Sequence, residues 1–424
     1  MATLHFYRGA EPSSTAETLL KLSRDVLVGE RDFEKEFGSI TTLESDLLTV
    51  ASSIFAADRG IARGEREDFA RSFELHIPVV NVGRLLPLMP KVQEILRLLS
   101  NDLWAINLYQ QSGERETSES KTPGPGKVLL FSGGLDSLAA AVEFSKEKPP
   151  LALISHVTKN RQTTTAQNAL KDILIAKGAK VTHHPFFVSS RNSGAFVHDA
   201  ENSQRTRSFV FLTLAALTAR RLNRREVVMI AENGQMAIHL PLSSARIAAF
   251  STHTAHPEVL TGMETFLQMA LDLDLTISNP YVSKTKREVI APIFAKAPEA
   301  IVSSNSCWKS ARLPANATHC GECIPCFIRR IAIESYGADM TAYGRDIFNE
   351  DFRSLLPDDD GRRNLADLAE FTLKFETLSD TELFDEWPEL FAIDSVSVIA
   401  MYRRAAADTR SVLSRYPAGQ QVLQ

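Results

Sequence analysis

The chain reads Val128-Leu-Leu-Phe-Ser-Gly-Gly-Leu-Asp-Ser-Leu-Ala-Ala-Ala141. The apolar run 128–131 predicts a strand covered on both faces, and the alanine-rich residues after the glycines predict a helix. Two consecutive glycines allow a tight turn with positive φ and let the backbone approach an anion without a Cβ clash. Because the N–H groups of the turn and of the first helical turn are free, this segment predicts a phosphate-binding loop.

The loop carries polar side chains as well as glycines. Ser132 and Ser137 can donate hydroxyl hydrogen bonds, and Asp136 is a candidate for organising Mg²⁺ or for capping the helix. The loop lacks the Gly-Lys-Ser/Thr ending of a Walker A motif. It resembles the SGGxDS signature of the PP-loop, or N-type ATP pyrophosphatase, superfamily. The resemblance implies ATP cleavage between the α- and β-phosphates, transfer of AMP to a substrate oxygen, and ATP binding by Ser132, Gly133, Gly134, Leu135, Asp136 and Ser137.

Strands and helices alternate from Lys127 onward. Strands are predicted over 128–131, 151–157, 180–188, 226–231 and 275–279, with helices over 135–146, 163–177, 207–222, 257–272 and 285–295. The alternation predicts an α/β fold with a doubly wound parallel sheet, of the PP-loop/HUP-like kind that the resemblance implies. In such a sheet the ligand lies beyond the carboxyl ends of the strands, where the strand order reverses.

Three further regions flank residues 127–336, which we assign to the ATP pyrophosphatase domain. Residues 1–109 mix predicted strands and helices and are expected to form an α+β accessory domain. Residues 110–126 are polar and rich in Ser, Gly and Pro, which is typical of a linker. Residues 337–424 have helical periodicity and are expected to form an extension that packs on the domain, serves oligomerisation, or does both.

The composition bounds the class of protein. The 424 residues include 44% hydrophobic and 23% charged residues, as in ordinary globular proteins, and the net charge of -5 disfavours a strongly basic nucleic-acid binder. The N-terminus has no signal-peptide pattern, and no stretch has the roughly 20 uncharged apolar residues of a membrane helix. We therefore expect a cytoplasmic protein without a membrane partner, and leave homo-oligomerisation open.

All four cysteines lie in one short segment, with the spacing C-x12-C-x2-C-x2-C: Cys307, Cys320, Cys323 and Cys326. Such clustering is unlike a disulfide framework, which would spread its cysteines over the fold. Four thiolates satisfy tetrahedral Zn²⁺ with no open position, so the pattern predicts a structural zinc knuckle. An Fe–S cluster and four free thiols are the alternatives.

The loop followed by these cysteines resembles the 7-cyano-7-deazaguanine synthase (QueC) family, over roughly 127–336. The family's Ser-Cys, Cys-Gly-x-Cys-x-x-Cys and downstream Arg correspond to Ser306-Cys307, 320–326 and Arg329 or Arg330. The resemblance implies adenylation of a 7-carboxy-7-deazaguanine-like carboxylate, Mg²⁺ as a cofactor, and attack by an amine. It also implies catalytic roles for Asp136, Lys286 in Thr285-Lys-Arg-Glu288, and Arg207 in Gln204-Arg-Thr-Arg-Ser-Phe209, with Arg205 as the alternative arginine. His156, Arg207 and Lys286 complete the predicted ATP site.

The chain departs from that family in the segment that recognises the base. Instead of Tyr-Pro-Asp-Cys-Arg it reads Ala231-Glu-Asn-Gly-Gln235, so Glu232, Asn233 and Gly234 are predicted to bind the substrate. Glu232 and Asn233 could instead bind Mg²⁺. Asn-Gly is also a common turn former, which leaves a purely structural role open. His253 and His256 could move protons near pH 7, although loop histidines are more often ordinary polar surface.

The added N-terminal and C-terminal regions resemble those of long QueC-like proteins in antiphage operons, the QatC-like and type IV CBASS-associated branches. That resemblance implies a protein amine from the same operon as a possible acceptor instead of ammonia, docked by the extra regions. Two alternative functions remain at this point: a PP-loop enzyme that modifies tRNA, and a non-catalytic nucleotide-binding subunit of a defence complex.

Overall fold

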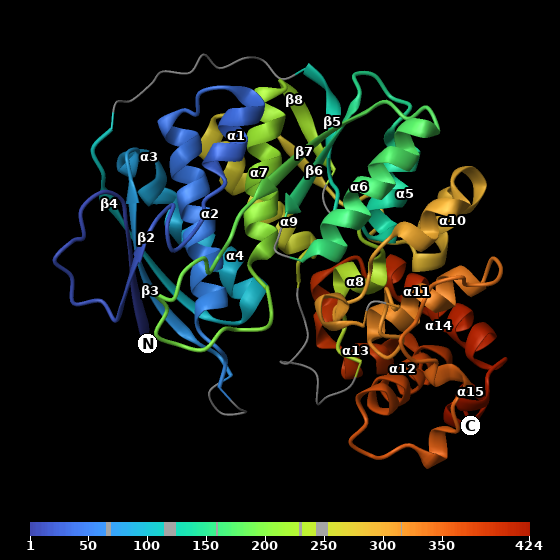
Figure 1. Ribbon diagram of the computed structural model, residues 1–424. Helices are drawn as coiled ribbons and strands as arrows, with labels where there is room; N and C mark the ends of the chain where they lie inside the picture. The colour runs from blue at the N-terminus through green and yellow to red at the C-terminus, as the bar shows by residue number, and fades with distance from the viewer. Residues whose placement is uncertain (65–68, 114–123, 158–159, 229–230, 243–252, 315) are drawn as a thin grey trace.

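The computed structural model describes residues 1–424 except 65–68, 114–123, 158–159, 229–230, 243–252 and 315. In the described chain, two parallel sheets lie on either side of a double layer of helices (Figure 1). A further group of helices, from the C-terminal part of the chain, packs at one end of the molecule (Figure 1). None of the described helices is long and apolar enough to cross a lipid bilayer.

The second sheet contains the strand that precedes the glycine loop. Its order is β7-β6-β5-β8-β9 and all its pairings are parallel. The strands are β5 (Gly124–Leu130), β6 (Leu151–Val157), β7 (Val181–Phe187), β8 (Arg224–Val228) and β9 (Thr276–Ser278). The chain steps outward from β5 to β7 on one side and from β8 to β9 on the other. The order therefore reverses between β5 and β8, and the predicted doubly wound parallel sheet is confirmed.

Helices cover both faces of this sheet. They are α5 (Leu135–Phe144), α6 (Arg161–Ala176), α7 (Arg207–Arg221), α9 (Pro257–Leu271) and α10 (Lys286–Lys296). Along β5 the side chains alternate: Val128 and Leu130 join the core with α7 and α9, whereas Leu129 packs with α5, α6 and α10. Two-sided burial explains why this strand is apolar at consecutive positions.

The N-terminal region is itself α/β, which corrects the expected α+β arrangement. Its sheet has the order β2-β1-β3-β4 with parallel pairing throughout. The strands are β1 (Ala2–Tyr7), β2 (Thr18–Lys21), β3 (Ser72–Val79) and β4 (Leu103–Gln110), and the helices are α1 (Glu30–Phe37), α2 (Thr42–Gly60), α3 (Val82–Leu85) and α4 (Met89–Ser100). Helical crossovers precede β3 and β4, whereas an irregular segment joins β1 to β2; each connection returns the chain to the same edge, so neighbouring strands run parallel.

Among the described residues, the N-terminal region shares its core with the rest of the chain, whereas a separate accessory domain at 1–109 would have a core of its own. Helix α2 packs on α7, and α4 packs on α9, so one continuous apolar core joins both sheets. Helix α7 is buried along its whole length from Ser208 to Ala219 because it has neighbours on every side. Of the expected linker 110–126, residues 114–123 lie outside the described residues, and β4 and β5 take up its two ends.

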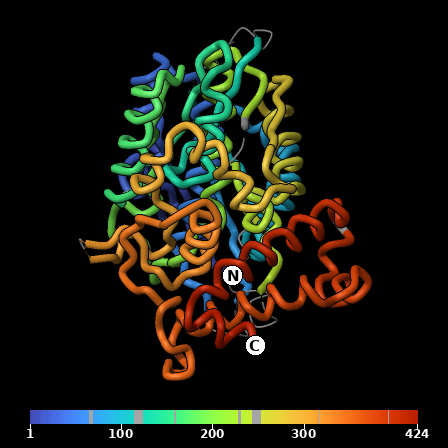
Figure 2. The backbone as a smooth tube through the Cα atoms, turned by 90° about the vertical axis from the view of Figure 1, so that its right-hand side faces the viewer, coloured from blue at the N-terminus to red at the C-terminus, as the bar shows by residue number. Residues whose placement is uncertain are grey.

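The C-terminal part is helical, with α11 (Ile324–Glu334), α12 (Asp360–Thr377), α13 (Asp380–Glu386), α14 (Ser395–Leu413) and α15 (Pro417–Val422). The short helix α8 (Gly234–Ile238), which follows β8, packs against α14. Figure 2 shows the orange and red helices gathered at the lower end of the molecule, beneath the sheets. These helices therefore contact the segments that follow the strands of the second sheet.

Candidate active site

The glycine loop joins β5 to α5 by a turn that requires glycine. Gly133 has φ +87°, in the left-handed region, and Gly134 is the N-cap of α5. Ser132 Oγ accepts a hydrogen bond from the Gly134 N–H at 3.3 Å, and Ser137 Oγ donates to the Gly134 carbonyl at 3.0 Å. The serines thus hold the loop open around the start of the helix, where an anion is favoured.

Asp136 is the centre of a buried polar cluster. Its Oδ2 accepts hydrogen bonds from Lys286 Nζ at 2.8 Å and from Asn233 Nδ2 at 3.0 Å. Its Oδ1 is buried without a hydrogen-bond partner among the described residues. Three segments meet here: α5, the turn after β8, and the N-terminus of α10. The structure therefore brings together two of the three residues predicted for catalysis, Asp136 and Lys286, and one residue predicted for substrate binding, Asn233.

Glu232 adds a second carboxyl group to this cluster. Burial, with the nearby Asp136 carboxylate, raises the pKa of Glu232 to about 7, while Lys286 acts in the opposite direction. Two carboxyl groups, one with an unpartnered oxygen, provide the hard oxygen ligands that Mg²⁺ binds. The residues present therefore fit a divalent cation held by Asp136 and Glu232.

Arg207 lies at the same edge of the sheet, positioned by His156. The ring of His156 donates from Nε2 to the Val188 carbonyl at 3.0 Å and accepts at Nδ1 from Arg207 Nε at 3.1 Å. Burial and the charge of Arg207 lower the pKa of His156 to about 3. A neutral imidazole therefore orients the guanidinium, which is a different role from the direct ATP contact predicted for His156.

The alternative arginine, Arg205, points elsewhere. Its side chain is 1% exposed, donates to the Ser100 carbonyl at 3.3 Å and lies over the ring of Phe69. Next to it, the Thr206 N–H and hydroxyl both donate to Asp58 Oδ2 at 3.0 Å. The N-terminal region thus holds the start of α7, from which Arg207 projects.

The four cysteines form one buried cluster. Their sulfur atoms all lie within 4.8 Å of one another, with Sγ–Sγ distances of 3.8 Å between Cys320 and Cys326 and 3.4 Å between Cys323 and Cys326. A zinc ion with bonds of about 2.3 Å to four sulfurs separates them by roughly 3.8 Å. The N–H of Cys320 also donates to Cys307 Sγ at 3.3 Å, as suits a thiolate. The donor set fits a structural zinc ion.

A knuckle turn between the cysteines depends on Gly321. Its φ is +79°, and a Cβ there would lie 1.9 Å from the Arg345 carbonyl oxygen. On the other side of the cluster, the Asn305 N–H donates to the Gly133 carbonyl at 2.8 Å. The cysteine segment therefore holds part of the glycine loop. Sequence reasoning missed Asn305, whose only signal was its place two residues before Cys307.

The family model described as "Queuosine biosynthesis protein QueC" matches residues 126–337, half of the chain. The chain belongs to the QueC family. No curated protein matches it. Membership supports an ATP-utilising, synthase-like enzyme of the PP-loop type, a class that uses ATP and Mg²⁺, with chemistry like that of 7-cyano-7-deazaguanine synthase.

The other predicted residues of this QueC family member have structural contacts. Arg329 is fully buried and donates to Ser304 Oγ at 2.8 Å, whereas Arg330 pairs with Glu334 and Asp346. Gly234 has no room for a side chain, because a Cβ would lie 2.3 Å from the Val282 carbonyl oxygen. Gly234 therefore serves close packing of the turn after β8.

The two loop histidines are part of the same structural background. His256 is the N-cap of α9, where its Nδ1 accepts from the Glu258 N–H at 3.4 Å, and His253 stacks on its ring at 5.2 Å. Burial lowers the pKa of both rings. These contacts agree with an ordinary role in the loop before α9.

Proposed function

We propose that this chain uses ATP to adenylate the carboxylate of a 7-deazaguanine, such as 7-carboxy-7-deazaguanine, and then passes the acyl group to an amine. A substrate carboxylate oxygen attacks the α-phosphorus, the bond from that phosphorus to the bridging oxygen breaks, and pyrophosphate leaves. The amine nitrogen then attacks the acyl carbon and loses a proton, and AMP leaves with the bonding electrons. The amide is the first product; a second activation of the amide oxygen would give the nitrile.

The observation that carries this proposal is the cluster at Asp136 beside the glycine loop. The loop N–H groups would hold the phosphates, and Lys286 and Arg207 would offset the charge that develops on pyrophosphate. Asp136 and Glu232 would hold Mg²⁺, which supplies further charge stabilisation when bound. The cysteine cluster would hold zinc away from the reaction, as a brace for the 304–307 segment.

The acceptor amine is the second part of the proposal. Ammonia and a protein amine serve the same acyl-adenylate, since only the incoming nucleophile differs. The N-terminal sheet and the helices after residue 337 lie outside the residues matched to the family. We propose that these regions receive a partner protein from the same operon, that the reaction serves antiphage defence, and that it takes place in the cytoplasm, where ATP is available.

The decisive experiment measures AMP, pyrophosphate and the acylated product by mass spectrometry. Reactions contain MgATP and 7-carboxy-7-deazaguanine with ammonia, or with a purified operon partner. We expect AMP to form only when the deazaguanine is present, and the product mass to identify the acceptor. The variant Asp136→Asn should lose AMP formation while keeping the wild-type melting temperature within a few degrees. Undiminished turnover by Asp136→Asn, or AMP formation that ignores the deazaguanine, would contradict the proposal.

A further inference from the structure

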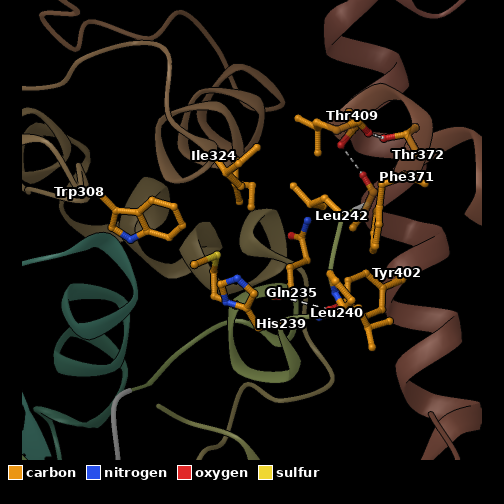
Figure 3. Close-up of a pocket in the computed structure, with 16 residues that line it drawn as sticks. Gln235, His239, Leu240, Leu242, Trp308, Ile324, Phe371, Thr372, Tyr402 and Thr409 are labelled. Carbon is orange, nitrogen blue, oxygen red and sulfur yellow. Dashed lines mark hydrogen bonds between the residues drawn. The ribbon is translucent and has the colours of Figure 1, made fainter. Parts of the chain in front are cut away.

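A pocket lies beside the active-site cluster, between the turn after β8 and the C-terminal helices. Its cavity volume is about 50 Å³, whereas a cavity that holds one water needs roughly 10–15 Å³. The pocket is therefore much larger than a packing defect. Figure 3 labels residues that line it, among them Gln235, Leu240, Trp308, Ile324, Phe371 and Tyr402.

The walls of this pocket are apolar and uncharged. Aromatic and aliphatic side chains make up most of its surface, and none of the described residues that line it carries a carboxylate, an ammonium or a guanidinium group. The imidazole ring of His239 is neutral near pH 7, because burial lowers its pKa to about 4. Such a surface suits a flat, uncharged ring and rejects an ion, which would lose its hydration.

A few polar groups are available to orient a ring inside the pocket. His239 Nδ1 is buried and has no hydrogen-bond partner in the described part of the chain. The hydroxyls of Thr372 and Thr409 donate to carbonyls of their own helices, at 2.7 and 2.8 Å, and keep their lone pairs. An apolar pocket with a few such groups is typical of heterocycle binding.

Gln235 lines the pocket and also contacts the start of α10, which carries Lys286. Its side-chain Oε1 accepts a hydrogen bond from the backbone N–H of Lys286 at 3.3 Å. A smaller second pocket, lined by Gln235, Ala405 and Lys286 among others, adjoins the first. Two residues earlier, Asn233 donates to Asp136. A ring in the apolar pocket would thus lie on the Lys286 side of the cluster.

We infer that this pocket binds the uncharged heterocycle of the substrate and directs the substituent carboxylate toward Lys286 and the glycine loop. The inference rests on the proposed function and names the site for its substrate. One wall comes from α12 and α14, through Phe371, Tyr402 and Ala405, which lie outside the residues matched to the QueC family. The C-terminal helices are therefore part of the substrate site.

The test fills the pocket from α14 and compares an outward change on the same helix. Ala405 is 5% exposed and lines both pockets, whereas Ala407 is exposed and lines neither. Titration calorimetry measures binding of 7-deazaguanine, which has no carboxylate, and of MgATP. We expect Ala405→Leu to weaken 7-deazaguanine binding at least tenfold without changing MgATP binding, and Ala407→Leu to match the wild type.

A second variant guards against misfolding of the first. Trp308→Ala removes a ring that is 49% exposed, so the fold should tolerate it, and we expect it to weaken 7-deazaguanine binding several-fold. Equal binding by wild type, Ala405→Leu and Trp308→Ala, or no binding by the wild type, would overturn the inference. If ring binding behaves as expected but no deazaguanine carboxylate elicits AMP, the pocket stands and the proposed reaction fails.

Discussion

Asp136 places its two carboxylate oxygens in different surroundings. Oδ2 is held by Lys286 and Asn233, while Oδ1 is buried with no partner in the described residues. An unpartnered buried carboxylate oxygen costs free energy unless a cation or a donor arrives. The free protein therefore carries an unfavourable buried group at this cluster, which a bound cation would relieve.

Glu232 makes the stability of the folded protein depend on pH. In the unfolded chain a glutamate ionises near pH 4.5, whereas burial beside Asp136 raises the pKa of Glu232 to about 7 in the folded protein. Between these two pH values the folded state holds a proton that the unfolded chain has lost. The contribution of Glu232 to the free energy of unfolding is therefore full below pH 4.5 and decreases as the pH rises to 7. At about 1.4 kcal/mol for each pH unit, ionised Glu232 costs about 3 kcal/mol above pH 7.

The variant Glu232→Gln should remove this dependence. We expect the variant to unfold at a higher temperature than the wild type at pH 8, with a smaller difference at pH 5, because the amide has no charge to bury. Differential scanning calorimetry at both values measures the effect without Mg²⁺ or ATP. Identical pH profiles for the two proteins would show that Glu232 is not desolvated.

Lys286 is predicted to act on the phosphates as well as on Asp136. We expect Lys286→Met to lower the rate of AMP formation by roughly 10²–10³, the usual loss for a buried group that stabilises transition-state charge. The matched control is Lys296→Met, because Lys296 is an exposed lysine at the far end of α10. A rate for Lys286→Met near that of Lys296→Met would leave Lys286 as a structural partner of Asp136.

At the scale of elements, two helix starts and one turn converge on the loop. Helix α5 begins at Leu135 after Gly134, and α10 begins at Lys286 after the capping box of Thr285 and Glu288. Parallel strands present their carboxyl ends at one edge, so α5 and the segment after β8 meet there. The cysteine segment closes the third side through Asn305, which bonds to Gly133.

Through this contact we expect zinc binding to support nucleotide binding. Gly321→Ala would force a Cβ into the Arg345 carbonyl and a left-handed φ on alanine, which alone costs about 1–3 kcal/mol. We expect the variant to lose zinc, measured by elemental analysis, and to bind MgATP more weakly. Gly337→Ala is the control, since a Cβ there meets no atom within 4 Å. Full zinc content in Gly321→Ala would refute the proposed knuckle.

At the scale of the whole molecule, both sheets depend on one shared core. Helix α2 packs on α7 and α4 on α9, and Asp58 of α2 accepts two hydrogen bonds from Thr206 at the start of α7. Removal of residues 1–113, with α2 and α4, would expose the buried faces of α7 and α9 to water, where contiguous apolar surface promotes aggregation. The same removal would release the residue that precedes Arg207.

Deletion of residues 1–113 should therefore abolish folding, and cleavage should not. We expect the shortened protein to be insoluble or to lack a cooperative thermal transition. As the control, a protease site placed between Gly113 and Gly124 allows the chain to be cut while the core contacts of the described residues stay in place. Size-exclusion chromatography should find the two pieces together and MgATP binding unchanged. A soluble, cooperatively folding deletion variant would show that the N-terminal region is a separate domain after all.

The sequence was sufficient for the features that rest on short-range patterns. The Gly-Gly turn after an apolar strand, the strand–helix alternation of 127–336 and the cysteine spacing each concern neighbouring residues, and these predicted the α/β fold, the loop and the possible zinc centre. The N-terminal region was misassigned because the four-residue strand β2 has a weak pattern. Helix α2 is buried on almost all sides, and a helix with small and apolar residues all round is typical of a position between two layers; this pattern was not used.

Only the tertiary structure decided which side chains share the site. Asp136 meets Asn233 and Lys286 across 97 and 150 residues of chain, and no local pattern records such pairings, because they depend on how crossovers bring strand ends to one edge. Packing also separated Arg205 from Arg207, assigned Gly234 to close packing, and joined two expected domains through one core. The C-terminal helices form one wall of the proposed substrate pocket, which no local pattern could predict, since a pocket exists only between packed elements.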